Sequence, residues 1–497
     1  MRLFIRRSSS SDSTQPDFIA RAVSKLKTLH PAAVGVGIFC LLLLLNSDSL
    51  AAPPFWDDII GVHTQAIWLA RNDFDIPTLF GMSRVAGSAF YNPTNPLCWI
   101  FAVTYRFFPP VVTHILAHLL NIAAVAGCSA LLWNALKKEQ DRFLFLLLAL
   151  AMPLIVAACA GTGQETLLAL LVFSSLICKM KNCERNAYLL ALAACLCKLT
   201  ALTLIFAYVS GEIIIQLQKK KLHPVKILLL LAGTAGTAVW YLYFFSFQES
   251  HFKWKPQECI SLLLNAYYLL LPMFVLSVIL LGRAKKIFQH LPLILFLLFY
   301  YAANAISAMP SLPRYGAVIV FPTVLLLASA LGNDRRSKYI TGGVILFSLF
   351  NIYGILLPEP ATHQLHDGSF MERSREFTLM RSQDRLFCAR LEKEAGNTPI
   401  VCTYPLLHML TVPEFGYVAN GLKEVYAGEY FHQLGNVRKM DRSVLQKNPV
   451  FIYTPDCFNW QIPRGAQFLY SSNPEEPLKG YILYRLPFNF SRSSSKR

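Results

Sequence analysis

The chain of 497 residues is apolar and basic: 54% of its residues are hydrophobic, 15% are charged, and the formal net charge is +17. A soluble domain carries roughly a quarter charged residues, so this composition excludes an ordinary soluble protein and predicts an α-helical polytopic membrane protein. The surplus of lysine and arginine falls largely in short loops, as the positive-inside rule expects, and therefore predicts no nucleic-acid partner.

The first part of the chain is expected to cross the membrane about eleven times. Residues 1–30 are basic and rich in serine, without a small-residue cleavage site, which predicts a cytoplasmic tail before an uncleaved span near 31–49. The stretch from Arg185 to Lys219 is basic at both ends, so we expect a tight helical hairpin, about 187–197 and 199–217, with Lys198 at its tip. The other spans of this transmembrane domain, 31–357, are expected near 111–134, 143–159, 164–178, 226–246, 260–281, 287–304, 315–331 and 339–357.

Two regions are expected outside the membrane, on the side opposite to the N-terminus. The first outer loop, 50–110, has apolar residues at helical spacing in 58–70 and 96–108, which predicts two helices lying on the membrane surface. Residues 358–490 have the mixed composition of a soluble α/β domain, with a helix over 371–395 and strands near 400–403, 450–453, 467–470 and 481–486. Three cysteines of this domain, Cys388, Cys402 and Cys457, leave room for one disulfide, and the tail 491–497 is expected to be disordered.

Three acidic residues are candidates for chemistry at the outer face. Asp57 and Asp58 follow the first span at a lipid–water boundary, where an ionised side chain usually has a function, such as that of a general base. The alternative is a helix N-cap, which requires only one of the two. Glu165 follows Gly161-Thr162-Gly163-Gln164 on the same side, as a second acid or as a first-turn residue that favours the helix dipole.

Two basic residues are candidates for binding an anion. Lys198 lies in apolar sequence, where a lysine costs roughly 3 kcal/mol on insertion scales, so it should face a cavity or an anion unless it reaches the outer interface. Arg314 precedes Tyr315 in an outer turn, where a guanidinium suits bidentate phosphate binding or the pair anchors the chain at headgroup level.

Histidines supply a further set of candidates near the outer face. His114 and His118 have the i, i+4 spacing of a metal pair, without the glutamate of an HExxH motif, so a polar lining of a cavity is the favoured interpretation. His63 is interpreted in the same way, and Asp58 and Glu165 are the other candidates for a divalent metal.

The order of these motifs resembles the GT-C superfamily of membrane glycosyltransferases, in particular the branch of protein O-mannosyltransferases and bacterial lipid A aminoarabinose transferases. The matching segments are Trp56-Asp57-Asp58, Tyr91-Asn92-Pro93-Thr94-Asn95-Pro96-Leu97, Glu165, Cys197-Lys198-Leu199-Thr200, and Arg314-Tyr315 with Pro322. The chain departs from the family in having no His/Lys-Pro-Pro form of the proline motif, and in having Asp58 and Glu165 where many members have Glu and Asp.

The resemblance implies transfer of a sugar from a polyprenyl-phosphate donor to an extracytoplasmic hydroxyl of a glycan, a lipid or a protein, with inversion. Asp57 would be the general base, Lys198 and Arg314 would stabilise the leaving phosphate, and Asp58 and Glu165 would orient the acceptor or hold a divalent ion. Tyr315, Tyr91 and His63 complete the expected substrate-binding set. The expected location is a bacterial inner membrane, with the C-terminal domain in the periplasm.

Other functions fit part of the same pattern. A transporter or flippase of lipid-linked saccharides would also need lysine and arginine beside an apolar groove, but would not need a base in the first outer loop. A non-catalytic scaffold would tolerate loss of the charged residues. An O-antigen polymerase or ligase is the nearest alternative among enzymes, although the large loop between late spans that is typical of those enzymes is missing from the sequence.

Overall fold

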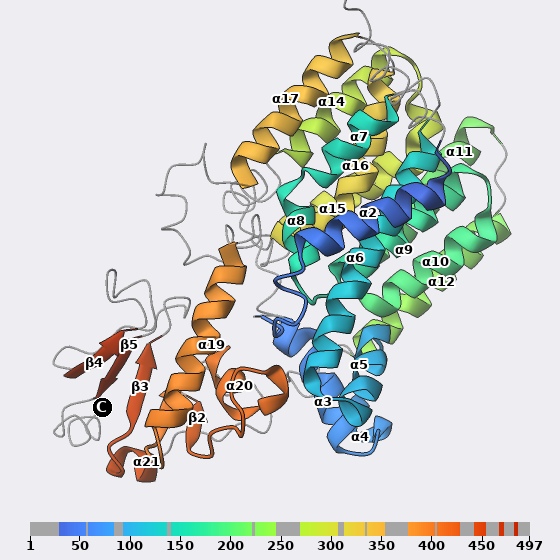
Figure 1. The fold of residues 1–497 in the computed structure, drawn as a ribbon. Coiled ribbons are helices and arrows are strands. Elements are labelled where there is room, and N and C mark those ends of the chain that lie inside the picture. Colours follow the sequence, from blue (N-terminus) through green and yellow to red (C-terminus); the bar gives the residue numbers. More distant parts are fainter. Residues whose placement is uncertain are drawn as a thin grey trace, which may run out of the picture.

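The computed structural model describes residues 29–55, 58–83, 93–136, 141–220, 224–244, 269–306, 313–332, 335–352, 376–402, 405–427, 442–453, 467–471 and 482–485. Within these ranges the protein is mostly helical, with a small sheet near the C-terminal end (Figure 1).

Apolar helices form the body of the molecule. They are α2 (Pro31–Leu45), α6 (Pro110–Ala135), α7 (Arg142–Leu150), α8 (Pro153–Ala160), α9 (Glu165–Met180), α10 (Glu184–Cys197), η2 (Leu199–Ala201), α11 (Leu202–Gln218), α12 (Pro224–Phe244), α14 (Leu270–Arg283), η4 (Ile287–His290), α15 (Leu291–Ile306), η5 (Pro313–Gly316), α16 (Ala317–Leu331) and α17 (Arg335–Ile352). The expected hairpin is present as α10 and α11, with Lys198 between them.

Three of these segments are long and apolar enough to cross a membrane: Pro110–Ala135, Leu199–Gln218 and Ile287–Ala305. The pair α7 and α8 raises the number to four if it forms one bent span, and α2, α14 and α16 are shorter apolar helices. The described residues therefore contain helices of membrane-like length and composition, whereas the figure of eleven spans stays a prediction.

The span expected at 143–159 is not one continuous helix. It is divided into α7 and α8, which meet at an angle of 60°. Pro153 is the first residue of α8, and a proline has no N–H to continue the hydrogen bonds of a preceding helix. The apolar run predicted helical segments here but not this bend, and whether the pair crosses the membrane as one span stays a prediction.

Helix α16 lies at the centre of the helical body, because residues 317–328 are all buried. Its Phe321 packs against Phe173 of α9, with 5.9 Å between the ring centroids. The outer helices have the opposite pattern: large apolar side chains such as Leu44, Leu189 and Val225 are exposed. Exposed apolar faces over a fully buried central helix are typical of a protein surrounded by lipid.

The first outer loop forms a compact group of short helices. They are a π-helical turn η1 (Ile59–His63), α3 (Thr64–Arg71), α4 (Ile76–Ser83) and α5 (Pro96–Phe107). Helix α5 begins where the sequence predicts, because Asn95 accepts a hydrogen bond from the Leu97 N–H at 2.9 Å and Pro96 takes the first helical position. Both surface helices expected in this loop are therefore present as helices.

The C-terminal domain contains a five-stranded mixed sheet. Its elements are α19 (Glu376–Glu394), β1 (Ile400–Cys402), α20 (Leu406–Thr411), η7 (Pro413–Phe415), β2 (Val425–Ala427), α21 (Arg442–Gln446), β3 (Val450–Tyr453), β4 (Gln467–Ser471) and β5 (Ile482–Arg485). The strand order is β2-β1-β3-β5-β4, in which β1 is parallel to β2 and β3, and β5 is antiparallel to β3 and β4. The helix and four of the strands were expected, whereas β2 was missed because three residues are too few for a recognisable pattern.

Cysteines of this domain are buried thiols where the structure describes them. Cys388 and Cys402 are both buried thiols outside any disulfide, and Cys457 lies outside the described residues. Burial raises the pKa of the Cys388 thiol well above its usual value, with smaller contributions from nearby Asp384, Cys402 and Glu392. No disulfide joins Cys388 to Cys402 in this structure.

The C-terminal domain packs directly on the first outer loop. Phe387 and Cys388 of α19 share a buried apolar cluster with Phe55 and Ile59 of the loop and Ala160 of α8. At the rim of this contact, Arg71 of α3 donates two hydrogen bonds to the Glu414 carboxylate, at 2.7 and 2.5 Å. Figure 1 shows the domain beside α3, α4, α5 and the adjacent end of α6.

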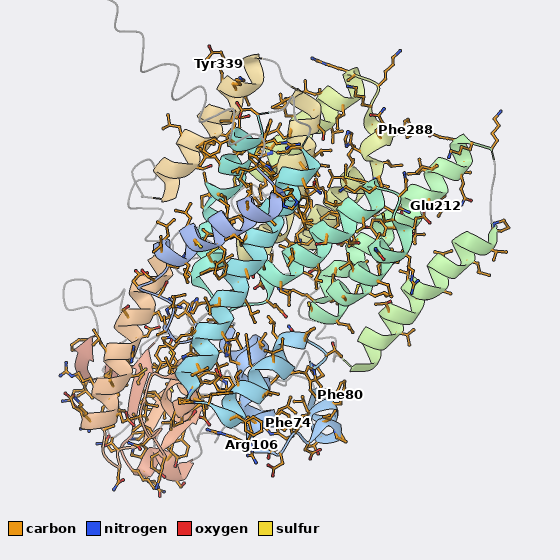
Figure 2. The ribbon with its side chains drawn as sticks, turned by 45° about the vertical axis from the view of Figure 1, so that its right-hand side comes forward. Phe74, Phe80, Arg106, Glu212, Phe288 and Tyr339 are labelled. Atoms are coloured by element: carbon orange, nitrogen blue, oxygen red, sulfur yellow. The ribbon has the colours of Figure 1, made fainter. Side chains whose placement is uncertain are left out.

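The molecule has two different ends. Figure 2 shows Phe74, Phe80 and Arg106 of the first loop at the end near the C-terminal domain, and Phe288 and Tyr339 at the opposite end. The basic loops around Arg283, Lys286 and Lys338 accompany Phe288 and Tyr339 in the sequence. The labelled residues of the first outer loop and the residues next to the basic loops therefore lie at opposite ends of the helical body.

Phe321→Ala should destabilise the helical body strongly. The ring is fully buried, and truncation of a buried phenylalanine typically costs about 3–5 kcal/mol because a cavity remains. Thermal unfolding of the purified protein in detergent measures the effect, with Phe288→Ala as the control because Phe288 is 52% exposed. Equal unfolding temperatures for the two variants would contradict the central position of α16.

Candidate functional site

Asp58 connects the first outer loop to the turn between α8 and α9. Its Oδ2 accepts hydrogen bonds from the Thr162 N–H at 2.9 Å and from the Thr162 hydroxyl at 3.0 Å. Asp58 precedes η1, but its side chain makes no capping hydrogen bond to that turn. The N-cap alternative therefore does not describe Asp58 in this structure, because its carboxylate is used for a long-range contact.

Gly163 makes room for two carboxylates that face one another. A Cβ at this position would lie 2.6 Å from Asp58 Oδ1 and 2.5 Å from Glu165 Oε2. Both oxygens thus approach the space that a side chain at residue 163 would occupy. The acidic residues of the first loop and of α9 consequently belong to one site, and a glycine between them is a requirement of that site.

Glu165 and Lys198 form a buried ion pair. Lys198 Nζ lies 2.9 Å from Glu165 Oε1, and the side chains are 18% and 8% exposed, respectively. The same ammonium lies over the ring of Tyr315, 3.6 Å from its centroid. Ion pairing and a cation–π contact together compensate the removal of the lysine charge from water. Lys198 therefore faces an anion, as the sequence predicted, and this anion is Glu165.

A break between two helices places Lys198 in this position. Lys198 has extended backbone angles, φ −159° and ψ 140°, after the last residue of α10 and before η2. Carbonyls at the end of a helix lack hydrogen-bond donors within the helix. The proline-containing motif of the first loop supplies these donors. Thr94 Oγ1 donates to Leu196 O at 3.2 Å, and Asn95 Nδ2 lies 3.5 Å from Cys197 O.

Asn95 also links this break to the turn that carries the acids. Its Nδ2 donates to Gln164 Oε1, and its Oδ1 accepts from Leu97 N–H at the start of α5. Asn95 is fully buried and Gln164 is nearly so. The sequence alone indicated no role for Asn95 or Gln164. An asparagine directly before a proline that opens a helix was an available signal for a cap, but its long-range partner was not.

Tyr315 is fixed from two sides. Its ring contacts Lys198, and its backbone carbonyl accepts a hydrogen bond from the buried Tyr300 hydroxyl at 2.7 Å. The preceding residue, Arg314, belongs to η5 (Pro313–Gly316), but its side chain is not among the described atoms. Asp57 and Tyr91 lie outside the described residues, so their predicted roles stay predictions.

The three candidate histidines make structural hydrogen bonds beside the site. His63 is fully buried, shares a 2.7 Å hydrogen bond with the Tyr105 hydroxyl and stacks on Phe101. His114 donates to Glu414 O at 3.1 Å, and His118 donates to Ala52 O at 3.3 Å. In this conformation His63 presents no surface to a substrate, and the other two rings each bind a backbone carbonyl.

No group of three or more His, Cys, Asp or Glu side chains arranged to hold a metal ion occurs in the part of the chain that the structure describes. His114 and His118 each donate their Nε2–H to a backbone carbonyl, and no third ligand joins them in the described part of the chain. The facing carboxylates of Asp58 and Glu165 are the remaining metal candidates among the described residues.

The arrangement combines an acidic pair with a buried cation. Carboxylates can accept a proton from a hydroxyl group, and a lysine beside an aromatic ring can stabilise developing negative charge in a site of low dielectric constant. Comparisons of the chain with protein-family models, with curated proteins and with solved structures gave no match.

His63 should make the stability of the protein depend on pH. Burial, reinforced by repulsion from His114 and His118, holds the pKa of His63 well below its usual value of 6.5. The folded protein therefore keeps the ring neutral, whereas the unfolded chain takes up a proton as the pH falls below 6.5. This contribution to stability is fully present above pH 6.5 and decreases by up to about 1.4 kcal/mol per pH unit below it, until the folded pKa is reached.

His63→Gln should flatten the decrease of the unfolding temperature between pH 7 and pH 5. Part of the decrease in unfolding temperature should remain, because burial lowers the pKa of His408 to about 4 and His408 therefore also destabilises the folded protein as the pH falls. His30→Gln is the control, since His30 is exposed. The interpretation fails if both variants keep the slope of the unmodified protein.

Proposed function

We propose that this protein is a membrane glycosyltransferase of the GT-C type, which transfers a sugar from a polyprenyl-phosphate donor to an acceptor hydroxyl. One observation carries the proposal: four separate segments bring their polar side chains to one place. Asp58 and Glu165 both border Gly163, Glu165 pairs with Lys198, and Lys198 lies over the ring of Tyr315. An acid beside a buried cation suits the transfer of a sugar away from a phosphate, because a carboxylate can accept the acceptor proton and a cation can stabilise the leaving phosphate.

In the proposed reaction, the Asp57 carboxylate takes the proton of the acceptor hydroxyl. The acceptor oxygen forms a bond to the anomeric carbon, and the bond from that carbon to the phosphate oxygen breaks on the opposite face, which inverts the configuration. The electron pair of the broken bond stays on the phosphate, and polyprenyl phosphate leaves. Asp57 is adjacent in sequence to Asp58, whose contact with Thr162 supports a position of this segment beside the site.

Lys198 and Arg314 are the proposed partners of the phosphate. Negative charge increases on the leaving phosphate in the transition state, and preorganised cations in a site of low dielectric constant favour that change. In this structure, Glu165 Oε1 lies 2.9 Å from Lys198 Nζ and balances its charge. A bound phosphate would share the ammonium with Glu165, while Tyr315 holds the ammonium in place from the other side.

Asp58 and Glu165 have the proposed role of orienting the acceptor. Their oxygens face the space above Gly163, where an acceptor hydroxyl could be held by hydrogen bonds. The same oxygens are the ligands that would hold a divalent ion, since carboxylates suit Mg²⁺ and Ca²⁺.

The surroundings of the site support a lipid-linked donor. Apolar side chains of α5 and α10 such as Ile100, Val103, Leu192 and Leu196 are exposed near the segments that bear the site, and a polyprenyl chain requires an apolar surface. The proposed location is a bacterial inner membrane, with about eleven spans, a cytoplasmic N-terminus and a periplasmic C-terminal domain. This orientation requires the basic loops and the first outer loop to lie at opposite ends, where Figure 2 shows their labelled residues.

The test of this proposal is incubation of the purified protein with a panel of polyprenyl-phosphate sugars and candidate glycan, lipid and protein acceptors, with product detected by mass spectrometry. Transfer by the unmodified protein and its loss in Asp57→Asn would support the enzyme. Movement of the donor across vesicles that is unchanged in Asp57→Asn, without transfer, would instead identify a transporter.

Lys198→Met should lower kcat on the order of 10²–10³-fold, the effect that removal of one stabilising group of a transition state typically has. The methionine side chain has a similar length but no charge, so the decrease in kcat measures the contribution of the lysine charge. Lys219→Met is the matched control, because Lys219 is exposed at the end of α11. A kcat within twofold of the unmodified value would remove Lys198 from the mechanism.

Gly163→Ala should leave the protein folded but reduce transfer at least tenfold. The new methyl group would overlap Asp58 Oδ1 and Glu165 Oε2, and these carboxylate ends can move aside at little cost in stability but lose their arrangement. Gly233→Ala is the control, because no atom lies within 4 Å of a Cβ at that position. Measurements of the initial rate and the unfolding temperature separate the two effects, and an unchanged rate would contradict the role of the carboxylate pair.

A further inference from the structure

Arg381 of the C-terminal domain reaches the segments that carry the acidic residues. It lies on α19 and is 3% exposed. Its Nη1 lies 3.3 Å from Pro53 O and 3.3 Å from Ala160 O. A single guanidinium nitrogen therefore joins the first outer loop to the end of α8.

Both carbonyls need a hydrogen-bond donor. Pro53 is buried, and the carbonyl groups of buried residues are paired in nearly all native structures. Ala160 is the last residue of α8, and the carbonyls at the end of a helix lack helical partners and favour a nearby cation. A buried carbonyl without a partner is costly, so Arg381 satisfies a requirement of each segment.

These two segments lead directly to the carboxylate site. Pro53 precedes Asp57 and Asp58 by four and five residues, and Ala160 precedes Thr162, which binds Asp58. The Asp58–Thr162 contact closes the junction between the segments on one side. Arg381 closes it on the other side.

A second residue of the C-terminal domain acts on the same loop. The buried Tyr417 hydroxyl donates a hydrogen bond to Pro54 O at 3.0 Å. Consecutive proline carbonyls are thus held by two side chains of one domain. By contrast, the Arg71–Glu414 pair at the rim, with side chains 50% and 24% exposed, docks the domain without touching either segment.

We propose that Arg381 is a positioning residue. Through this one guanidinium, the C-terminal domain holds the segments 53–58 and 160–165 in fixed positions relative to one another and thereby completes the active site. This inference rests on the proposed transferase function for its kinetic consequence. Its structural consequence, loss of register between the two segments, can be measured without any activity.

The structural test is hydrogen–deuterium exchange of the full-length protein in detergent, comparing Arg381→Met with the control Arg390→Met. Arg390 is on the same helix, and its side chain is half exposed and pairs with Glu394. Arg381→Met should raise exchange at least fivefold in peptides covering 52–62 and 158–166 and leave α16 protected, whereas Arg390→Met should change none of them. Unchanged exchange in both peptides would overturn the inference, whatever the protein catalyses.

The kinetic test is a double-mutant cycle between Arg381→Met and Thr162→Val. Each single variant should lower kcat on the order of 10–100-fold with the donor KM within threefold, because small displacements of reacting groups have effects of this size. If Arg381 acts through the Asp58–Thr162 junction, the double variant should lose little more than the worse single variant. If the fold-decrease in kcat of the double variant equals the product of the two single decreases, the positioning role is overturned and Arg381 has only a general role in docking.

Arg381→Lys provides the conservative variant. Its ammonium has enough hydrogens for both carbonyls on a shorter side chain, so it should recover part of the exchange protection and part of kcat. If Arg381→Met unfolds, the same comparisons are made on Arg381→Lys and Tyr417→Phe, and normal exchange and kcat in both would again overturn the inference. Exchange that changes as expected in a protein without transferase activity would refute the proposed function and leave the junction in place.

Discussion

The ion pair between Glu165 and Lys198 is the interaction on which the candidate site depends. A lysine inside an apolar bundle is unfavourable without a partner, and an isolated carboxylate at that depth is equally so. Their contact at 2.9 Å fixes the start of α9 against the break between α10 and η2. Tyr315 then adds the start of α16 to the same point. Three helices that are distant in sequence thus have their ends determined by one pair of charges.

Around that pair, small and polar residues allow close approach of loops. Gly163 lets two carboxylates face one another, and Asn95 satisfies groups on α5, the α8–α9 turn and the end of α10. Thr162 supplies both its backbone and its hydroxyl to Asp58. The contacts of Asp58 with Thr162 and of Asn95 with Gln164 and Cys197 join residues far apart in sequence. The geometry of the site is consequently a property of the whole fold and of no single motif.

The difference between local sequence patterns and long-range contacts explains what the sequence predicted and what it did not. Apolar runs, basic loops and alternating patterns are local, and they located most helices, the break at Lys198 and the strands β1, β3, β4 and β5. The position of Glu165 and Lys198 on one face followed from sidedness. The partners of Asp58, the burial of His63 and the reach of Arg381 depend on long-range packing, for which a single sequence has no signal. The bend between α7 and α8 was hidden because Pro153 also suits the first turn of a helix.

The two layers of contact between the C-terminal domain and the first loop respond differently to dissolved ions. The outer layer, Arg71 with Glu414, is half open to water, and counterions screen such pairs within about 10 Å at 0.1 M salt. The inner layer of Arg381 and Tyr417 is shielded from solvent and is insensitive to the same ions. A rise in salt concentration would therefore weaken the periphery of the domain first and leave its inner contacts through Arg381 and Tyr417 in place.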